Sequence, residues 1–237
     1  MSVNVLDPIQ PDELLADRAY RELSRAIITG RIEPGTRLSV PELARQLDIS
    51  RSPVREAVQR LIYDGLAENR GRRGAVVASI DPRDFLSLLE VRQLLEGFAA
   101  RKAAANASDA HIKVLRDVVE QHRDMIESGS IAEATHVEFD QSFHSVLRDI
   151  AGNEDLTAIL GRMQGRAHLS FATLWTEPFR PEQAVVEHAA ILDAVEARDP
   201  AQAEAAACAH IDAVRQRYVE RLGDTESAAV AEAEKGE

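Results

Sequence analysis

The 237-residue sequence has few cysteines, few aromatic residues and no long apolar run. Its single cysteine, Cys208, cannot form an intramolecular disulfide, which indicates a reducing compartment such as the cytoplasm. Aromatic residues make up only 4% of a chain that is 45% hydrophobic, and this balance favours helices over a β-sandwich. No apolar run reaches the ~18–20 residues that span a bilayer, and the N-terminus lacks the pattern of a signal peptide. We therefore expect a cytoplasmic, mainly helical protein that does not enter a membrane.

The net charge of −12 is unevenly distributed along the chain. Residues 11–80 hold 12 arginines against 10 acidic residues, a net charge of +2. Residues 81–237 hold 16 lysines and arginines against 29 acidic residues, a net charge of −13. Because the local field matters more than net charge for contact with DNA, the basic N-terminal part is a candidate for nucleic-acid binding.

Three helices are expected in the N-terminal part. Apolar residues recur at near-helical spacing over residues 11–29. A second, short helix should follow Ser39, which forms the pattern of a capping box with Glu42. A third helix should run over residues 51–64, because Pro53 is tolerated in a first turn and a glycine follows the last apolar residue.

A β-hairpin is expected after these helices. Residues 66–69 and 75–78 can form two short strands around a tip of arginines and glycines. Arg72 and Arg73 on this tip are expected to reach an adjacent minor groove or the DNA backbone. Three helices followed by a hairpin are typical of a winged helix-turn-helix, which we place at residues 11–79.

The third helix is predicted to present a polar face. At 100° per residue, Arg51, Ser52, Arg55 and Gln59 fall on one side, opposite an apolar side that packs on the first two helices. Such a helix fits the major groove, where arginine binds guanine in bidentate fashion and serines such as Ser50 suit phosphate. An ordinary solvated helix with surface arginines is the alternative.

The remainder of the chain is expected to be an all-helical bundle of about six helices over residues 80–222. Ser79 or Asp81 can cap the first of them, and Pro82 suits a first turn. The segment 223–237 is acidic and rich in small residues, so it is predicted to be disordered. The six expected helices are residues 82–106, 108–128, 131–151, 154–176, 181–198 and 200–222.

Three ordered motifs run through residues 20–78: I-x-x-G-x-I-x-P-G-x-x-L, then L-A-x-x-L-x-I-S-R-x-P-V-R-E-A-x-x-R-L, then R-R-G-A-x-V. With these motifs the segment resembles the DNA-binding domain of GntR-type bacterial transcription regulators. The stretches "EVRQLLEGFAARKAA", "FDQSFHSVLRDIAGN", "EHAAILDAVEARDP" and "CAHI" follow. Through them, residues 81–222 resemble the helical effector domain of the FadR subfamily, the FCD domain.

This resemblance implies a homodimer that binds a palindromic operator on double-stranded DNA, usually as a repressor that a small metabolite releases. Some relatives have a DNA-contacting arginine just before the Glu-Leu of the second helix, where this chain has Pro41. The operator sequence therefore cannot be transferred from them. The resemblance implies DNA contact at Ser50, Arg51, Ser52, Arg55 and Gly74.

A metal site is the second prediction. Asp140 and His144 are four residues apart and so share a helix face, while His188 and His210 lie in two later helices. Four such ligands can hold a divalent ion inside a bundle. Spacing alone favours the interpretation that they are unrelated residues, and His136 is a rival ligand. Metal-binding FCD domains place an Asp, a His four later and two further histidines in the last two helices, so the resemblance implies this site.

The ligand types leave the metal open. Imidazole favours Zn, Ni, Cu or Fe, and carboxylate admits Mn; Zn is the ion we expect first, with Ni, Mn or Fe as alternatives. A small carboxylate effector could bind nearby. Arg92, which often lines the effector pocket in the family, is expected to clamp it, although an i,i+4 pair with Glu96 is the alternative. Arg162 and Arg166 lie one turn apart and could assist as effector-binding residues, although surface pairing is the favoured alternative.

Three functions fit these observations unequally. A metabolite-responsive DNA-binding regulator explains both the arginine helix and the metal ligands. A metal-dependent hydrolase or other metalloenzyme would use Asp140 and the histidines, but no motif such as HExxH supplies a general base. A dimerisation protein without DNA affinity would leave the basic helix unexplained. We therefore predict a regulator and no enzymatic activity.

Overall fold

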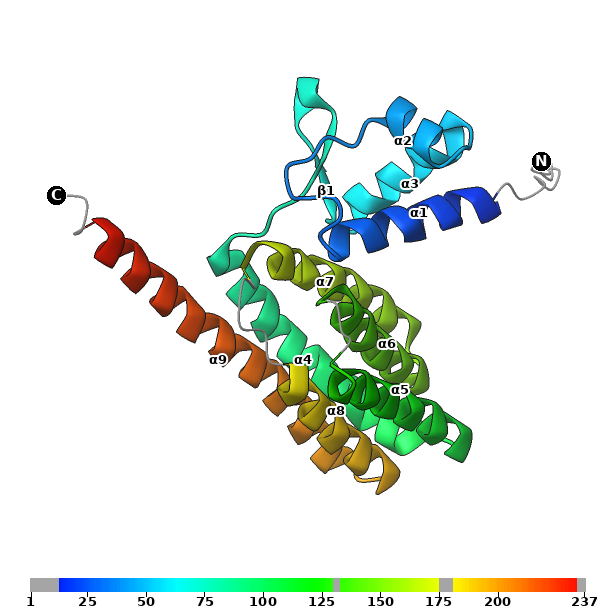
Figure 1. Ribbon diagram of the computed structural model, residues 1–237. Coiled ribbons are helices and arrows are strands. Elements are labelled where there is room, and N and C mark those ends of the chain that lie inside the picture. Colours follow the sequence, from blue (N-terminus) through cyan, green and yellow to red (C-terminus); the bar gives the residue numbers. More distant parts are fainter. Residues whose placement is uncertain (1–12, 130–132, 175–180, 234–237) are drawn as a thin grey trace, which may run out of the picture. The chain divides into compact units, whose positions relative to one another are not determined.

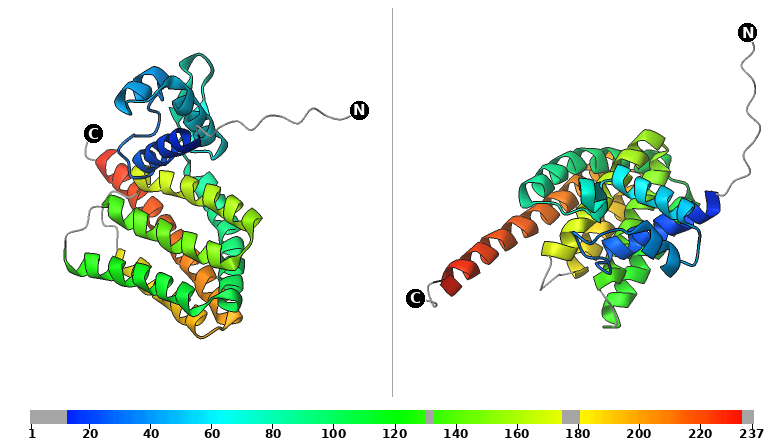
Figure 2. Two further views of the ribbon diagram at one scale, coloured as in Figure 1. Left: turned by 90° about the vertical axis from the view of Figure 1, so that its right-hand side faces the viewer. Right: turned by 90° about the horizontal axis from the view of Figure 1, so that it is seen from above.

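The computed structural model describes residues 13–129, 133–174 and 181–233. The chain divides into two compact units between Ser79 and Ile80, and each has its own core. Figures 1 and 2 show helices with a small β-hairpin in the N-terminal unit and a C-terminal unit built from helices. The predicted fold class, a winged helix-turn-helix followed by a helical bundle, is confirmed.

Over its described residues, 13–79, the N-terminal unit contains three helices and one antiparallel hairpin, in which Ala67 pairs with Val77 and Asn69 with Ala75. Its helix α3 packs on α1 and α2 through a wholly buried apolar side that includes Val54, Ala57 and Leu61. A single 3-10 turn joins the two strands. Its elements are α1 (Glu13–Ile28), α2 (Val40–Gln46), α3 (Arg51–Tyr63), β1 (Ala67–Asn69), the turn Gly71–Arg73 and β2 (Ala75–Val77).

The capping box predicted for α2 is wrong. Ser39 occupies the N-cap position with an extended backbone, but its side chain makes no capping hydrogen bond. The carboxylate of Glu42 instead accepts hydrogen bonds from Arg45 at 2.6 Å and from Gln46 at 3.1 Å. A charged guanidinium one turn away is a stronger donor than a neutral backbone N–H, so the carboxylate turns along the helix and not back to the cap.

The C-terminal unit is a bundle in which α4 packs against α6, α7, α8 and α9 (Figure 1). Of the two residues predicted to cap α4, Asp81 does so: its carboxylate accepts hydrogen bonds from the backbone N–H groups of Arg83 and Asp84 at 2.8 and 2.9 Å. The core joins Leu115, Phe143 and Ile191 from three different helices. The helices are α4 (Pro82–Asn106), α5 (Asp109–Glu127), α6 (Glu133–Ala151), α7 (Glu154–Leu174), α8 (Pro181–Glu196) and α9 (Pro200–Ala233).

The last helix is longer than predicted. The sequence suggested an end at residue 222 and a disordered segment over 223–237, but α9 continues to Ala233 and its C-terminal part projects past α8 (Figures 1 and 2). Alanine and glutamate have high helix propensity even though they bury little surface, which explains why low hydrophobicity was misleading here. Residues 234–237 lie outside the described residues, as does Trp175. Among the described helices, none is both long and apolar enough to cross a membrane.

Candidate DNA interface and metal centre

The polar face predicted for α3 is exposed. Ser50 holds the N-cap position of α3, and its side chain makes no capping hydrogen bond. Both this hydroxyl and the first N–H groups of the helix are therefore available to an anion such as a DNA phosphate. The exposed side chains on this face are Ser50, Arg51, Ser52, Arg55 and Gln59.

The arginines of the N-terminal unit fall into two groups. Arg51, Arg55, Arg72 and Arg73 are exposed, and none of their side chains has a hydrogen bond or ion pair with another described residue. Arg60, on the same helix, instead pairs with Asp17 and lies over the ring of Tyr20, with its guanidinium carbon 4.4 Å from the ring centroid. Arg60 is therefore a packing residue, a distinction that helical projection alone did not make.

Gly74 sets the shape of the hairpin tip. Its φ of 75° and ψ of −155° lie in a region that essentially only glycine adopts. Its carbonyl accepts a hydrogen bond from the N–H of Arg70 at 3.0 Å, which closes the tip. Arg72 and Arg73 are held on the exposed turn between these two residues. The glycine is thus required for the turn geometry that displays the two arginines.

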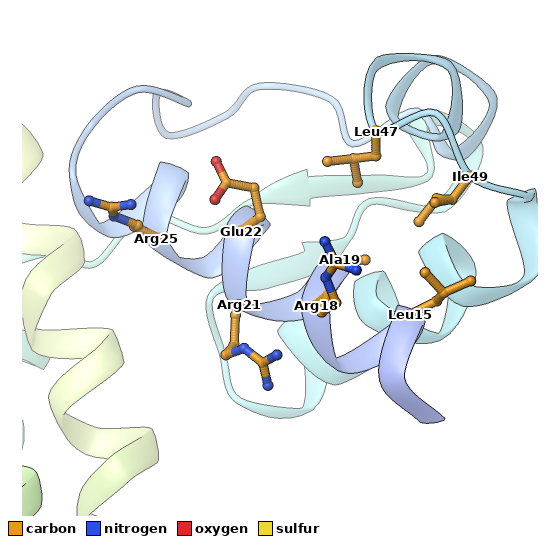
Figure 3. Close-up of a pocket in the computed structure, with 8 residues that line it drawn as sticks. All are labelled: Leu15, Arg18, Ala19, Arg21, Glu22, Arg25, Leu47 and Ile49. Atoms are coloured by element: carbon orange, nitrogen blue, oxygen red, sulfur yellow. The ribbon is translucent and has the colours of Figure 1, made fainter. Parts of the chain in front are cut away.

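A separate cavity of about 490 Å³ lies within the N-terminal unit, between α1 and the turn from α2 to α3 (Figure 3). Leu47 and Ile49 face Leu15 and Ala19 across it. None of the residues predicted to contact DNA lines this cavity. Its lining is Leu15, Arg18, Ala19, Arg21, Glu22, Arg25, Leu47 and Ile49.

The C-terminal unit brings together the four predicted metal ligands. Asp140 and His144 lie one turn apart on α6, His188 lies on α8 and His210 on α9. One ligand atom from each residue lies within 4.8 Å of the other three. All three imidazoles are buried, with exposed fractions of 1 to 3%. The cluster is therefore built by packing of three helices and not by one loop.

The distances suit a small divalent ion. His144 Nε2 lies 3.3 Å from His210 Nε2 and 3.7 Å from Asp140 Oδ1. His188 Nε2 lies 3.6 Å from the same carboxylate oxygen. A tetrahedral zinc ion with bonds of ~2.0–2.1 Å holds its ligand atoms ~3.3–3.4 Å apart, so small side-chain shifts would suffice.

One buried nitrogen gives independent support for a metal site. His188 Nε2 is buried and has no hydrogen-bond partner among the described residues. Burial, reinforced by His210 and His144, lowers the pKa of His188 well below its usual range, so the imidazole is neutral. Burial alone would raise the pKa of Asp140, but the imidazoles of His144, His168 and His188 outweigh it and hold this pKa well below its usual range. Neutral histidine and ionised carboxylate are the states that bind a metal.

Further side chains around the cluster orient these ligands. The carboxylate of Glu187 lies 2.7 Å from His210 Nδ1 and is itself held by Arg217. The other oxygen of Asp140 lies 3.0 Å from His168 Nε2 and accepts a hydrogen bond from Gln164 at 3.3 Å. Carboxylate–histidine pairs of this kind fix the tautomer and orientation of metal-binding imidazoles. The residues present therefore fit a divalent metal.

Two family models match the chain. Residues 15–77 match the bacterial regulatory proteins of the gntR family, and residues 87–213 match the FCD domain. The chain belongs to the GntR family of transcription regulators. Its FCD domain is consistent with the FadR subfamily.

Relatives of this GntR-family chain are themselves regulators. It is 31% identical over 218 residues to the HTH-type transcriptional repressor RspR of Escherichia coli, covering 89% of this chain and 90% of the relative. It is 29% identical over 205 residues to the probable D-xylose utilization operon transcriptional repressor of Paenarthrobacter nicotinovorans, covering 86% and 89%. The E. coli structure McbR/YncC shares the fold, with a TM-score of 0.78 at 19% identity over 88% and 98% of the two chains. The metalloenzyme alternative is therefore not supported.

The structure separates the two predicted effector arginines of this GntR-family protein. Arg92 is buried and donates to Glu96 at 3.0 Å, so the predicted i,i+4 pair is present. Arg166 is exposed on α7, because Gln164 and His168, each two residues from it, take the face that meets Asp140. Two residues along a helix is a rotation of about 200°, which turns Arg166 away from the cluster.

Other residues near the cluster were missed or differently placed. His136, the rival ligand, lies with its Nδ1 2.9 Å from His122 Nε2 and is not part of the four-residue group. Glu96 Oε2 lies 3.3 Å from His144 Nδ1, and Arg148 lies beside the same carboxylate. The only signal for these two residues in the sequence is their spacing from a predicted site residue. Glu96 follows Arg92 by four residues, and Arg148 follows His144 by four residues.

Proposed function

We propose that this GntR-family regulator binds operator DNA as a homodimer through α3 and the hairpin, and that a small carboxylate metabolite bound beside a divalent metal modulates that binding. The DNA contacts would come from the exposed face of α3. Arg51, Arg55 and Gln59 would contact base edges, and Ser50 and Ser52 would contact phosphate. Arg72, Arg73 and Gly74 would place the hairpin on an adjacent groove or backbone.

One observation carries the metal part of this proposal. Four ligand atoms from three helices lie within 4.8 Å of one another, and one of them, His188 Nε2, is buried without a partner. Asp140, His144, His188 and His210 would hold the ion, with Zn favoured and Ni, Mn or Fe as alternatives. A divalent ion supplies positive charge and open coordination positions for an anionic ligand.

The regulatory step rests on differential binding. The effector must bind more tightly to the dimer geometry that does not fit the operator than to the one that does. A preference of roughly 5- to 150-fold corresponds to ~1–3 kcal/mol of coupling between the two sites.

Metal content of the full-length, untagged protein tests this proposal. Elemental analysis should find about one metal ion per protomer in the wild type, and His188→Ala should lose it, because removal of one of four ligands opens the site. His122→Ala is the matched control, since His122 is equally buried but lies outside the cluster. Wild-type protein that binds DNA but holds no metal would refute the metal-linked effector and leave the DNA-binding part standing.

A further inference from the structure

Two arginines are buried side by side with a single carboxylate between them. Arg92 on α4 and Arg148 on α6 are each only 5% exposed. Arg92 lies 3.0 Å and Arg148 lies 3.8 Å from the same oxygen of Glu96. Two guanidinium groups therefore share one partner in the interior, where a charge normally requires its own.

Several donors of this pair have no acceptor. Within the part of the chain that the structure describes, Nε of Arg92 and both Nε and Nη1 of Arg148 are buried without a hydrogen-bond partner. Glu96 Oε2 and His144 Nδ1 also lack one, but they lie 3.3 Å apart and a small ring rotation would pair them. Nη1 of Arg148 lies 3.8 Å from Glu96 Oε1, but each arginine Nε is left without an acceptor among the described residues. Because a buried unsatisfied charged group is costly, these donors suit an acceptor that arrives with a ligand.

The arginine pair adjoins the metal ligands. Asp140, His144 and Arg148 follow one another at intervals of four residues on α6, so all three lie on one face, each about 6 Å further along the axis. Glu96 contacts both Arg92 and the imidazole of His144. One ligand can therefore reach the metal cluster and the arginines together.

The charges of the site define the ligand further. The carboxylates of Asp140 and Glu96 balance the guanidinium groups of Arg92 and Arg148, and histidines that bind a metal do so as neutral imidazoles. A divalent ion then leaves two positive charges in a buried site. A ligand with two negative charges neutralises them, whereas a monocarboxylate leaves one uncompensated.

We propose that Arg148, together with Arg92, forms an anion subsite that selects an effector with two carboxylates, the second of which binds the buried arginine donors. This inference rests on the proposed function and deepens it by naming the effector class. Arg148 takes the role that the sequence suggested for Arg166, which is exposed on another face.

Calorimetric titration of the metal-loaded, full-length protein tests the inference. The probes are pairs of equal carbon number: succinate against butyrate, glutarate against valerate, and malate against 3-hydroxybutyrate. At least one dianion should bind tenfold or more tightly than its paired monoanion. Arg148→Met should weaken that dianion at least tenfold and change the monoanion less than twofold. Arg166→Met, the matched control, should behave as the wild type.

The same samples separate the two proposals. Equal affinities within every pair, no binding of any probe, or an Arg148→Met variant that binds as the wild type would overturn the arginine subsite while metal content and DNA binding stay intact. Metal-free wild-type protein would refute the metal part of the proposed function, yet Arg148-dependent binding of a carboxylate would still support the subsite. If Arg148→Met fails to fold, Arg148→Lys keeps the charge and loses the planar donor fork, and it should still weaken the dianion at least threefold.

Discussion

Arginine side chains on α3 look alike in the sequence but differ in exposure and in their partners in the folded protein. Arg51 and Arg55 are exposed and make no hydrogen bond or ion pair with another described residue. Arg60 is committed to Asp17 and Tyr20. A side chain without a protein partner costs little stability when it is removed, so its loss should be felt mainly in binding.

Arg55→Ala should therefore weaken DNA binding with little effect on stability. We expect a loss of about 1–3 kcal/mol, or roughly 5- to 150-fold, on a duplex that the wild-type protein selects from a random pool. Arg31→Ala is the control: it removes the same charge from the same unit, where Arg31 forms an exposed pair with Glu22 at 3.2 Å. Fluorescence anisotropy gives the affinities, and equal effects of the two changes would show that only net charge matters.

At the scale of helices, the sequence was most informative where a pattern is local. Hydrophobic spacing and caps gave α4 at residues 82–106, as observed, because both signals depend on residues within one turn. The shared face of Asp140 and His144 is local in the same way. His188 and His210 came from the resemblance. Glu96 was expected only as a partner of Arg92, and Arg148 and His168 were not found, because their positions near the cluster depend on how separate helices pack.

Gly97 shows such a packing dependence. It lies on α4 against α9, and a Cβ placed there would lie 2.6 Å from the sulfur of Cys208. Gly97→Ala should therefore destabilise the protein by about 1–3 kcal/mol through overpacking, even though alanine favours a helix by about 1 kcal/mol over glycine. Urea unfolding at fixed metal saturation measures this cost.

Two further variants test the cause. Adding Cys208→Ala to Gly97→Ala should restore wild-type stability, since the clashing sulfur is gone. Gly161→Ala on α7, where nothing lies within 4 Å of the added Cβ, should stabilise the protein by up to about 1 kcal/mol. A Gly97→Ala variant as stable as Gly161→Ala would mean that α4 and α9 are less closely packed than described.

Over the whole molecule, charge divides with the two units. Residues 11–80 carry a net charge of +2 and residues 81–237 a net charge of −13. The exposed arginines without a partner among the described residues include Arg51 and Arg55 on α3 and Arg72 and Arg73 on the hairpin tip, where they can meet DNA. An acidic effector domain repels DNA phosphate elsewhere, so attraction should be confined to the reading helix and the hairpin. Removal of a charge that contacts DNA should therefore change the salt dependence of binding, whereas removal of a charge far from the DNA should not.

Salt titration of full-length protein on its selected duplex separates these signatures. Each phosphate contact contributes about −0.9 to the slope of log K against log salt. If Arg72 and Arg73 both contact phosphate, the double change to alanine should reduce the magnitude of the slope by about 2. The control is Lys113→Ala with Arg116→Ala, which removes two positive charges from α5, where they pair with Asp117 and Glu196. These residues make no phosphate contact, so the slope should be unchanged. Equal slopes for wild type and the hairpin variant would place the hairpin away from the DNA backbone and leave recognition to α3.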